Sequence, residues 1–168
     1  GVSTRLLGAL IMTHSDDAGL VLPPPVAPLQ VVVVPIKQET EEVRQKVDEI
    51  CVALKKAGIR VKVDDRENMR PGAKYFEWER KGVPIRLDVG PRDVGNNAAM
   101  IVTRHDGCKS TISTGDDLVE LIKETMDKMH NDLYDAASER LAKKTFRLDS
   151  YDTMKAMIQK GGDGDLES

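Results

Sequence analysis

"LQVVVVPI", residues 29–36, is an apolar run rich in β-branched valines, and a long helical pattern follows it. A continuous run of this kind is typical of a strand that is buried on both faces of a sheet. From about Thr40 to Ala57 apolar residues recur at helical spacing, and Gly58 ends the pattern. A buried strand followed at once by an amphipathic helix indicates the start of an α/β domain.

The alternation of strand and helix continues after this first pair. "IRVKVDD" (59–65) and "PIRLDVG" (84–90) alternate apolar and polar residues with the period of a strand. Between them we expect a short helix from about Gly72 to Lys81, because Gly82 follows as a stop signal.

The last strands form a predicted hairpin, and a long helix follows it. Residues 98–114 contain two strand-like halves around Asp106 and Gly107, a favoured hairpin turn. From about Asp116 to Lys143 apolar residues form a stripe along one helical face. These elements predict an α/β fold, a mixed five-stranded sheet with flanking helices. Such a fold by itself names no function.

The two ends of the chain differ from this central part. Thr4 to His14 is expected to be a short helix whose apolar side needs a partner surface. Residues 15–28 contain three consecutive prolines, which indicate a linker or domain boundary. A helix is expected near 153–159, and 160–168 has the composition of a disordered tail. Since no initiator Met is present, we expect a piece of a longer protein.

The composition is that of a soluble globular protein, with 168 residues, 40% apolar and 32% charged. A net charge of −3 excludes attraction of the whole molecule to a polyanion, so a nucleic-acid site must be a local patch. Cys51 and Cys108 form no CxxC pair and predict neither a disulfide framework nor a zinc site. No apolar run approaches a membrane span. We therefore expect a cytoplasmic protein, with an organelle as the other possible location.

One polar stretch, "KYFEWERKGVPIRLDVGPRD" (74–93), holds the only tryptophan and three of the six aromatic residues. On a helix, Tyr75 and Glu79 share a face, with Trp78 beside them. Proteins read single-stranded RNA by stacking a base on an aromatic ring and hydrogen-bonding its Watson–Crick edge. Guanine offers two adjacent donors, N1–H and N2–H, and one carboxylate can accept both. This face therefore predicts a guanine-reading site.

Basic residues that follow this helix extend the predicted site. Arg86 and Arg92 lie on or just after the next strand and could meet guanine O6 and N7 or a phosphate. Lys109, just past the hairpin turn, could add a phosphate contact.

Simpler interpretations compete with these assignments. Phe76 and Trp78 could be core residues that anchor the helix to its sheet. Arg86 and Asp88, two apart on one strand face, could form only a solvated ion pair.

Other clusters carry weaker signals. His14, Asp16 and Asp17 could ligate a metal, but polarity at a helix end explains them adequately. The glycines of "GPRDVGNNA" (90–98) match neither a dinucleotide-binding motif nor a phosphate-binding loop. The sequence therefore predicts no self-contained catalytic site and no metal site.

Several stretches together resemble the prolyl-tRNA synthetase family of the eukaryotic and archaeal type. They are "GVSTRLLGALIMTHSDDAGLVLPPPVAP" (1–28), "VVVVPI" (31–36) and "RPGAKYFEWERKGVPIRLDVGPRD" (70–93). The resemblance extends over residues 1 to about 159 in consistent order and spacing. It implies a C-terminal fragment of a class II aminoacyl-tRNA synthetase.

The resemblance divides the chain into three parts. Residues 1–28 would be the end of the catalytic domain, where the third class II motif places Arg5 at ATP with Ser3 nearby. Residues 29–145 would be the anticodon-binding domain. Residues 146–168 would begin a C-terminal extension that is partly disordered.

The resemblance also implies which residues meet tRNA. In the family, an aromatic and a glutamate on the short helix, with basic residues on the next strand and loops, face the two guanines of the proline anticodon. The matching positions are Tyr75, Glu79, Arg86, Arg92 and Lys109. The parent enzyme would be a homodimer that joins proline to its tRNA, using ATP with magnesium. The fragment alone would be inactive, with no bound cofactor or metal.

Two other classes of function remain open on the residues alone. One is a non-catalytic RNA-binding or protein-interaction α/β module, whose RNA binding would ignore anticodon sequence and fall steeply with salt. The other is a small-molecule-binding α/β domain, which would need a closed pocket at the carboxyl edge of the sheet.

Overall fold

A computed structural model describes residues 3–37 and 40–162. The chain divides into two compact units, one extending to Asp135 and the other beginning at Ala136. The first unit contains the sheet and the helices that pack on it. The second contains the end of one long helix and a further helix.

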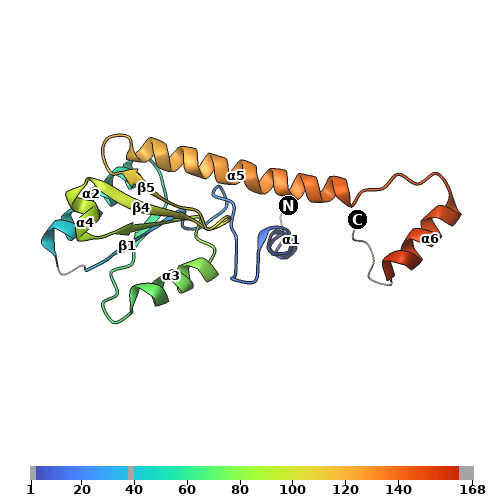
Figure 1. Cartoon of the computed structure of the whole chain (residues 1–168), viewed down its shortest axis with the longest axis horizontal. Coiled ribbons are helices and arrows are strands. Elements are labelled where there is room, and N and C mark those ends of the chain that lie inside the picture. Colours follow the sequence, from blue (N-terminus) through green and yellow to red (C-terminus); the bar gives the residue numbers. More distant parts are fainter. Residues whose placement is uncertain (1–2, 38–39, 163–168) are drawn as a thin grey trace. The chain divides into compact units, whose positions relative to one another are not determined.

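The first unit is built around a five-stranded sheet in the order β2-β1-β3-β4-β5. Strands β1, β4 and β5 are labelled in Figure 1. Strand β1 pairs in parallel with β2 and β3, whereas β4 is antiparallel to both β3 and β5. The predicted mixed sheet is therefore confirmed. The strands are β1 (Val31–Pro35), β2 (Val61–Val63), β3 (Ile85–Val89), β4 (Ala98–Thr103) and β5 (Lys109–Ser113).

The strand register brings distant polar residues onto one face of the sheet. Arg86 of β3 pairs with Val32 on one side and with Val102 of β4 on the other, and Val102 pairs with Lys109 of β5. Paired residues on neighbouring strands point to the same face. Arg86 and Lys109 therefore share the face that carries Val32.

The opposite face of the sheet carries the main core. Helices α2 (Glu41–Lys56) and α5 (Leu118–Lys143) contribute their apolar stripes to it, and α4 (Pro91–Gly95) adds Val94. Figure 1 shows α3 on the other side of the sheet from α5. The fully buried residues of this core include Val31, Val33, Val43, Leu54, Ile85, Leu87 and Ile122.

Helix α3 (Pro71–Arg80) packs on the face that carries Arg86. Trp78 is buried against Val32 and Val34, so its predicted core role is confirmed. The same prediction for Phe76 is wrong, since this residue is 62% exposed. Residues two positions apart on a helix point about 200° apart around its axis, because each residue turns the helix by about 100°. Phe76 therefore points away from the sheet when Trp78 points toward it.

The remaining helices lie mostly where the sequence places them. Helix α1 (Arg5–His14) matches its prediction, whereas the short helix α4 lies in a stretch for which the sequence predicts no helix. Helix α6 (Tyr151–Gly162) contains the predicted 153–159. It continues through 160–162, where the composition predicts disorder; residues 163–168 lie outside the described residues. No helix within the described ranges combines the length and apolar character needed to cross a bilayer.

Candidate nucleic-acid interface

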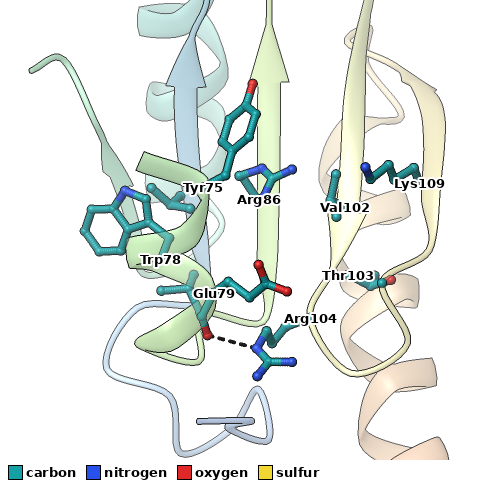
Figure 2. Close-up of a pocket in the computed structure, with 11 residues that line it drawn as sticks. Tyr75, Trp78, Glu79, Arg86, Val102, Thr103, Arg104 and Lys109 are labelled. Atoms are coloured by element: carbon teal, nitrogen blue, oxygen red, sulfur yellow. Dashed lines mark hydrogen bonds between the residues drawn. The ribbon is translucent and has the colours of Figure 1, made fainter. Parts of the chain in front are cut away.

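A cavity of about 270 Å³ lies between α3 and the uncovered part of the sheet, over β3, β4 and β5 (Figure 2). Helix α3 borders this cavity because Trp78 seats it on Val32 and Val34 of β1, which leaves the β3 to β5 side open. The polar side chains that line the cavity are Tyr75, Glu79, Arg86, Thr103, Arg104 and Lys109.

The cavity brings together four of the five residues that the sequence predicts for RNA contact. Tyr75 and Glu79 project from α3, Arg86 comes from β3 and Lys109 from β5. The fifth, Arg92, is exposed on α4 beyond the carboxyl end of β3 and does not line the cavity. Tyr75 and Glu79 thus share a face of α3, as their helical spacing predicts.

Arg86 is held in place by two neighbours. Its guanidinium carbon lies 3.8 Å from the centroid of the Tyr75 ring, and its Nε donates to Asp88 Oδ1 at 3.1 Å. The side chains of Arg86 and Asp88 are only 14% and 7% exposed, so the expected solvated pair is instead a buried one. The pair is buried because α3 covers both residues, a contact that the strand pattern does not reveal.

Burial raises the pKa values of two residues in this cluster, Asp88 and Tyr75. It raises the pKa of Asp88, although Arg86 and a hydrogen bond with Tyr75 oppose the change. Burial also raises the pKa of Tyr75, and the nearby Asp88 carboxylate adds to the effect. Tyr75 is half-buried with Arg86 against its ring, so neither side chain is fully exposed to solvent.

Glu79 and Lys109, in contrast, are exposed at the mouth of the cavity. Within the part of the chain that the structure describes, neither side chain makes an ion pair or a hydrogen bond. Glu79 and Lys109 lie on opposite sides of one cavity. The Glu79 carboxylate can accept hydrogen bonds from two donors of a ligand, and the Lys109 ammonium group can bind an anion.

The sequence pattern does not reveal Arg104, the buried cation in the cavity wall. Its Nε donates to the Glu79 carbonyl oxygen at 2.9 Å, and its Nη atoms donate to both carboxylate oxygens of Asp16 at 2.6 and 2.8 Å. These bonds hold the pKa of Asp16 at about 2. No local signal could have found the pair, since 88 positions separate the two residues.

The contact between Asp16 and Arg104 also bears on the metal alternative at His14, Asp16 and Asp17. Both carboxylate oxygens of Asp16 accept hydrogen bonds from Arg104. Within residues 3–37 and 40–162, no group of three or more His, Cys, Asp or Glu side chains could hold a metal ion.

A second polar network anchors α3 on its other side. Trp78 Nε1 donates to Asp64 Oδ2 at 2.7 Å, and Lys74 Nζ donates to the Asp64 carbonyl oxygen at 3.0 Å. Burial raises the pKa of Asp64, but hydrogen bonds from Arg66 and Trp78 outweigh it and lower the value to about 2. Arg66 also bonds to Glu77 at 2.7 Å, so the network ties the loop after β2 to α3.

The fold and the cavity define a domain that presents a carboxylate, a guanidinium and an ammonium group on one face of a mixed sheet. Residues 30–125, more than half of the chain, match the family described as anticodon binding domain. The chain belongs to this family.

The relatives within this class are proline–tRNA ligases. The enzyme of Phocaeicola vulgatus is 46% identical over 165 residues, which cover 96% of this chain and 33% of that protein. The enzyme of Thermococcus kodakarensis is 45% identical over 161 residues, covering 95% and 33%. The chain therefore spans about a third of the length of these relatives.

A solved structure shows the same likeness. The prolyl-tRNA synthetase from Cryptosporidium parvum, crystallised with L-proline and AMP, is 43% identical and matches with a TM-score of 0.84. The match covers 89% of this chain and 32% of that chain. The resemblance to prolyl-tRNA synthetases and the predicted fold are thereby confirmed.

Proposed function

We propose that this chain reads the anticodon of proline tRNA as part of a proline–tRNA ligase. Family membership and the likeness to proline–tRNA ligases support the proposal. The observation that carries it is the free Glu79 carboxylate, which shares one cavity with Arg86 and Lys109.

Each group in the cavity has a distinct role in this proposal. Glu79 accepts N1–H and N2–H of a guanine. Arg86 uses Nε for Asp88, so its Nη atoms remain to donate to guanine O6 or N7. Tyr75 holds the Arg86 guanidinium over its ring instead of serving as a free stacking surface. Lys109 meets a phosphate.

Arg92 belongs to the same proposal but not to the same cavity. It is exposed on α4, at the carboxyl end of β3. We assign it to the second anticodon guanine or to a neighbouring phosphate, because an exposed arginine can serve either group.

The activity of the parent is also part of the proposal. The parent joins proline to the terminal ribose of its tRNA with ATP and magnesium, acts as a homodimer, and resides in the cytoplasm or an organelle. Residues 1–28 end its catalytic domain, 29–145 bind the anticodon and 146–168 begin an extension. Arg5 is exposed at the first position of α1, which leaves its guanidinium available for an ATP phosphate, and Ser3 is exposed beside it. No magnesium ligand is assigned to this chain.

The anticodon role is tested by binding the 168-residue chain to an anticodon stem-loop of proline tRNA. We expect exchange of either guanine for adenine to weaken binding, by about 1–3 kcal/mol for each lost base contact. Glu79→Gln should remove most of the guanine preference at one position. Equal binding of all stem-loops, together with a steep salt dependence, would contradict the proposal and favour a general RNA-binding module.

The ATP role of Arg5 is tested separately in the full-length parent. Arg5→Ala should slow proline-dependent ATP–pyrophosphate exchange, since charge on the phosphates loses a partner. Glu79→Gln should leave that exchange unchanged and serves as the matched control. Normal exchange with Arg5→Ala would refute the role.

A further inference from the structure

Arg104 is a buried cation that the guanine-reading proposal leaves without a task. Its side chain is 4% exposed, yet it lines the cavity between Glu79 and the end of β4. All three of its guanidinium nitrogens already donate, one to the Glu79 carbonyl oxygen and two to Asp16. Arg104 is therefore placed to hold neighbouring groups of the protein.

The group that Arg104 holds is the end of α3. The Glu79 carbonyl lies in the last turn of that helix, where it lacks the usual donor four residues on; it accepts from Gly82 N at 3.0 Å, and Arg104 is its second donor. A guanidinium at this end also complements the negative pole of the helix dipole. The bond is drawn as the dashed line in Figure 2.

The segment that carries Asp16 contacts the same end of α3. Leu20 N donates to the Arg80 carbonyl oxygen at 3.1 Å. Gly19, at φ 138°, lies so close that a Cβ there would come within 2.6 Å of Arg80 Cα. Asp16 itself is held in a tight turn, because its carboxylate accepts from the backbone of Ala18 and Gly19.

We propose that Asp16 and Arg104 form a brace that fixes the end of α3 and thereby the direction of the Glu79 carboxylate. Both are then positioning residues for guanine selection, and the inference rests on the proposed function. The Glu79 side chain has no hydrogen-bond or ion-pair partner in the described part of the chain, so the position of its backbone sets which part of the cavity its carboxylate can reach. Selection of a base edge needs such support behind the contacting group.

Asp16 makes this idea testable, because it lies outside the cavity and its side chain bonds to Arg104, which in turn bonds to the Glu79 carbonyl oxygen. The test compares binding of the 168-residue chain to stem-loops that carry guanine or inosine, which lacks the N2 amino group. The anticodon position is the one at which Glu79→Gln removes the preference. Asp16→Asn should reduce the guanine-to-inosine affinity ratio at least about threefold, and Asp16→Glu less, since it keeps the charge.

Two controls separate positioning from general damage. Asp17→Asn changes the adjacent exposed carboxylate, which has no ion pair in the described structure, and should keep the wild-type ratio. In the Glu79→Gln background, Asp16→Asn should cause no further loss of the ratio, since both changes act on the same contact. Urea unfolding followed by Trp78 fluorescence shows which fraction of each variant is folded.

The outcomes distinguish the brace from the function on which it rests. If Glu79→Gln loses the preference while folded Asp16→Asn keeps the full ratio, the brace is refuted and the anticodon role stands. An additive loss in the double variant also refutes it. If the unaltered chain shows no preference for guanine, both the anticodon role and the brace fail. If Asp16→Asn does not fold, Asp16→Glu takes its place in the test. The brace is refuted if NMR shows that Asp16→Glu has lost the contact with Arg104 while its guanine-to-inosine affinity ratio stays at the wild-type value.

Discussion

Arg86 lies over the ring of Tyr75, with its guanidinium carbon 3.8 Å from the ring centroid. The two residues come from different elements, α3 and β3, and Asp88 binds both of them. The arginine is therefore oriented before any ligand arrives, which reduces the entropy lost when its Nη atoms contact a base.

Replacing Arg86 should affect RNA binding and stability together. Arg86→Ala removes a donor pair for guanine and should weaken stem-loop binding by about 1–3 kcal/mol. It also leaves the buried Asp88 without its cation, so the free energy of unfolding should fall by about 3 kcal/mol. Calorimetric binding and urea unfolding measure the two effects.

Arg92→Ala is the matched control for the effect on stability. Arg92 is exposed on α4, so its removal should leave the free energy of unfolding within about 0.5 kcal/mol of the original. If Arg86→Ala binds the stem-loop as tightly as the unaltered chain, Arg86 does not contact the base.

Substitution of Trp78 should lower the stability of the fold, whereas substitution of Phe76 on the same helix should leave it almost unchanged. Trp78→Phe removes one of the two donors to the buried Asp64 Oδ2 and leaves only Arg66 Nη2, which should cost about 1–3 kcal/mol of stability. Phe76→Ala changes a side chain that is 62% exposed and should stay within about 0.5 kcal/mol. Chemical denaturation of both variants checks this, and a larger loss for Phe76→Ala would contradict the assignment of faces on α3.

Most of the fold could be predicted because its elements have local signals. The valine run of β1 and the alternation in 84–90 are visible in short windows, and each decides strand or helix without reference to distant residues. The strand order β2-β1-β3-β4-β5 depends on contacts between residues far apart, so a local pattern does not determine it. Helix α4 could not be predicted in the same way, because its five residues contain both a proline and a glycine.

The site was predictable to the extent that it depends on one helix. Tyr75 and Glu79 share a face by helical spacing alone, and the cavity confirms that pairing. The partners of Arg86 and Arg104 depend on how α3 and residues 16–20 pack on the sheet, which a linear pattern does not contain. The prediction for Phe76 is wrong because aromatic character is a weaker guide to burial than its position two residues from Trp78.

The stability of the first unit should fall in acid, and Asp64 should account for part of the fall. Its pKa of about 2 lies below the ordinary 3.8, so its ionised form stabilises the fold above pH 3.8, and this contribution is lost as the pH falls toward 2. Asp64→Asn should therefore reduce the loss of unfolding free energy between pH 7 and pH 2.5, by up to about 2 kcal/mol. Asp16, whose pKa is also about 2, should preserve some acid sensitivity. An unchanged pH profile in Asp64→Asn would contradict this prediction.

Two glycines with positive φ angles should differ in how well they tolerate alanine, and the difference measures how closely residues 16–20 lie against α3. Gly58 has φ 77° and open space around it, so Gly58→Ala should cost only about 1 kcal/mol of backbone strain. Gly82 has φ 72°, and a Cβ there would come within 2.7 Å of the Leu20 carbonyl oxygen. Gly82→Ala should therefore lower the free energy of unfolding by at least about 1 kcal/mol more than Gly58→Ala, because it also displaces Leu20 from the end of α3. Urea unfolding of the two variants under identical conditions gives the comparison. Equal losses would mean that residues 16–20 move aside without cost, and in that case the contact between Leu20 and Arg80 does not hold α3.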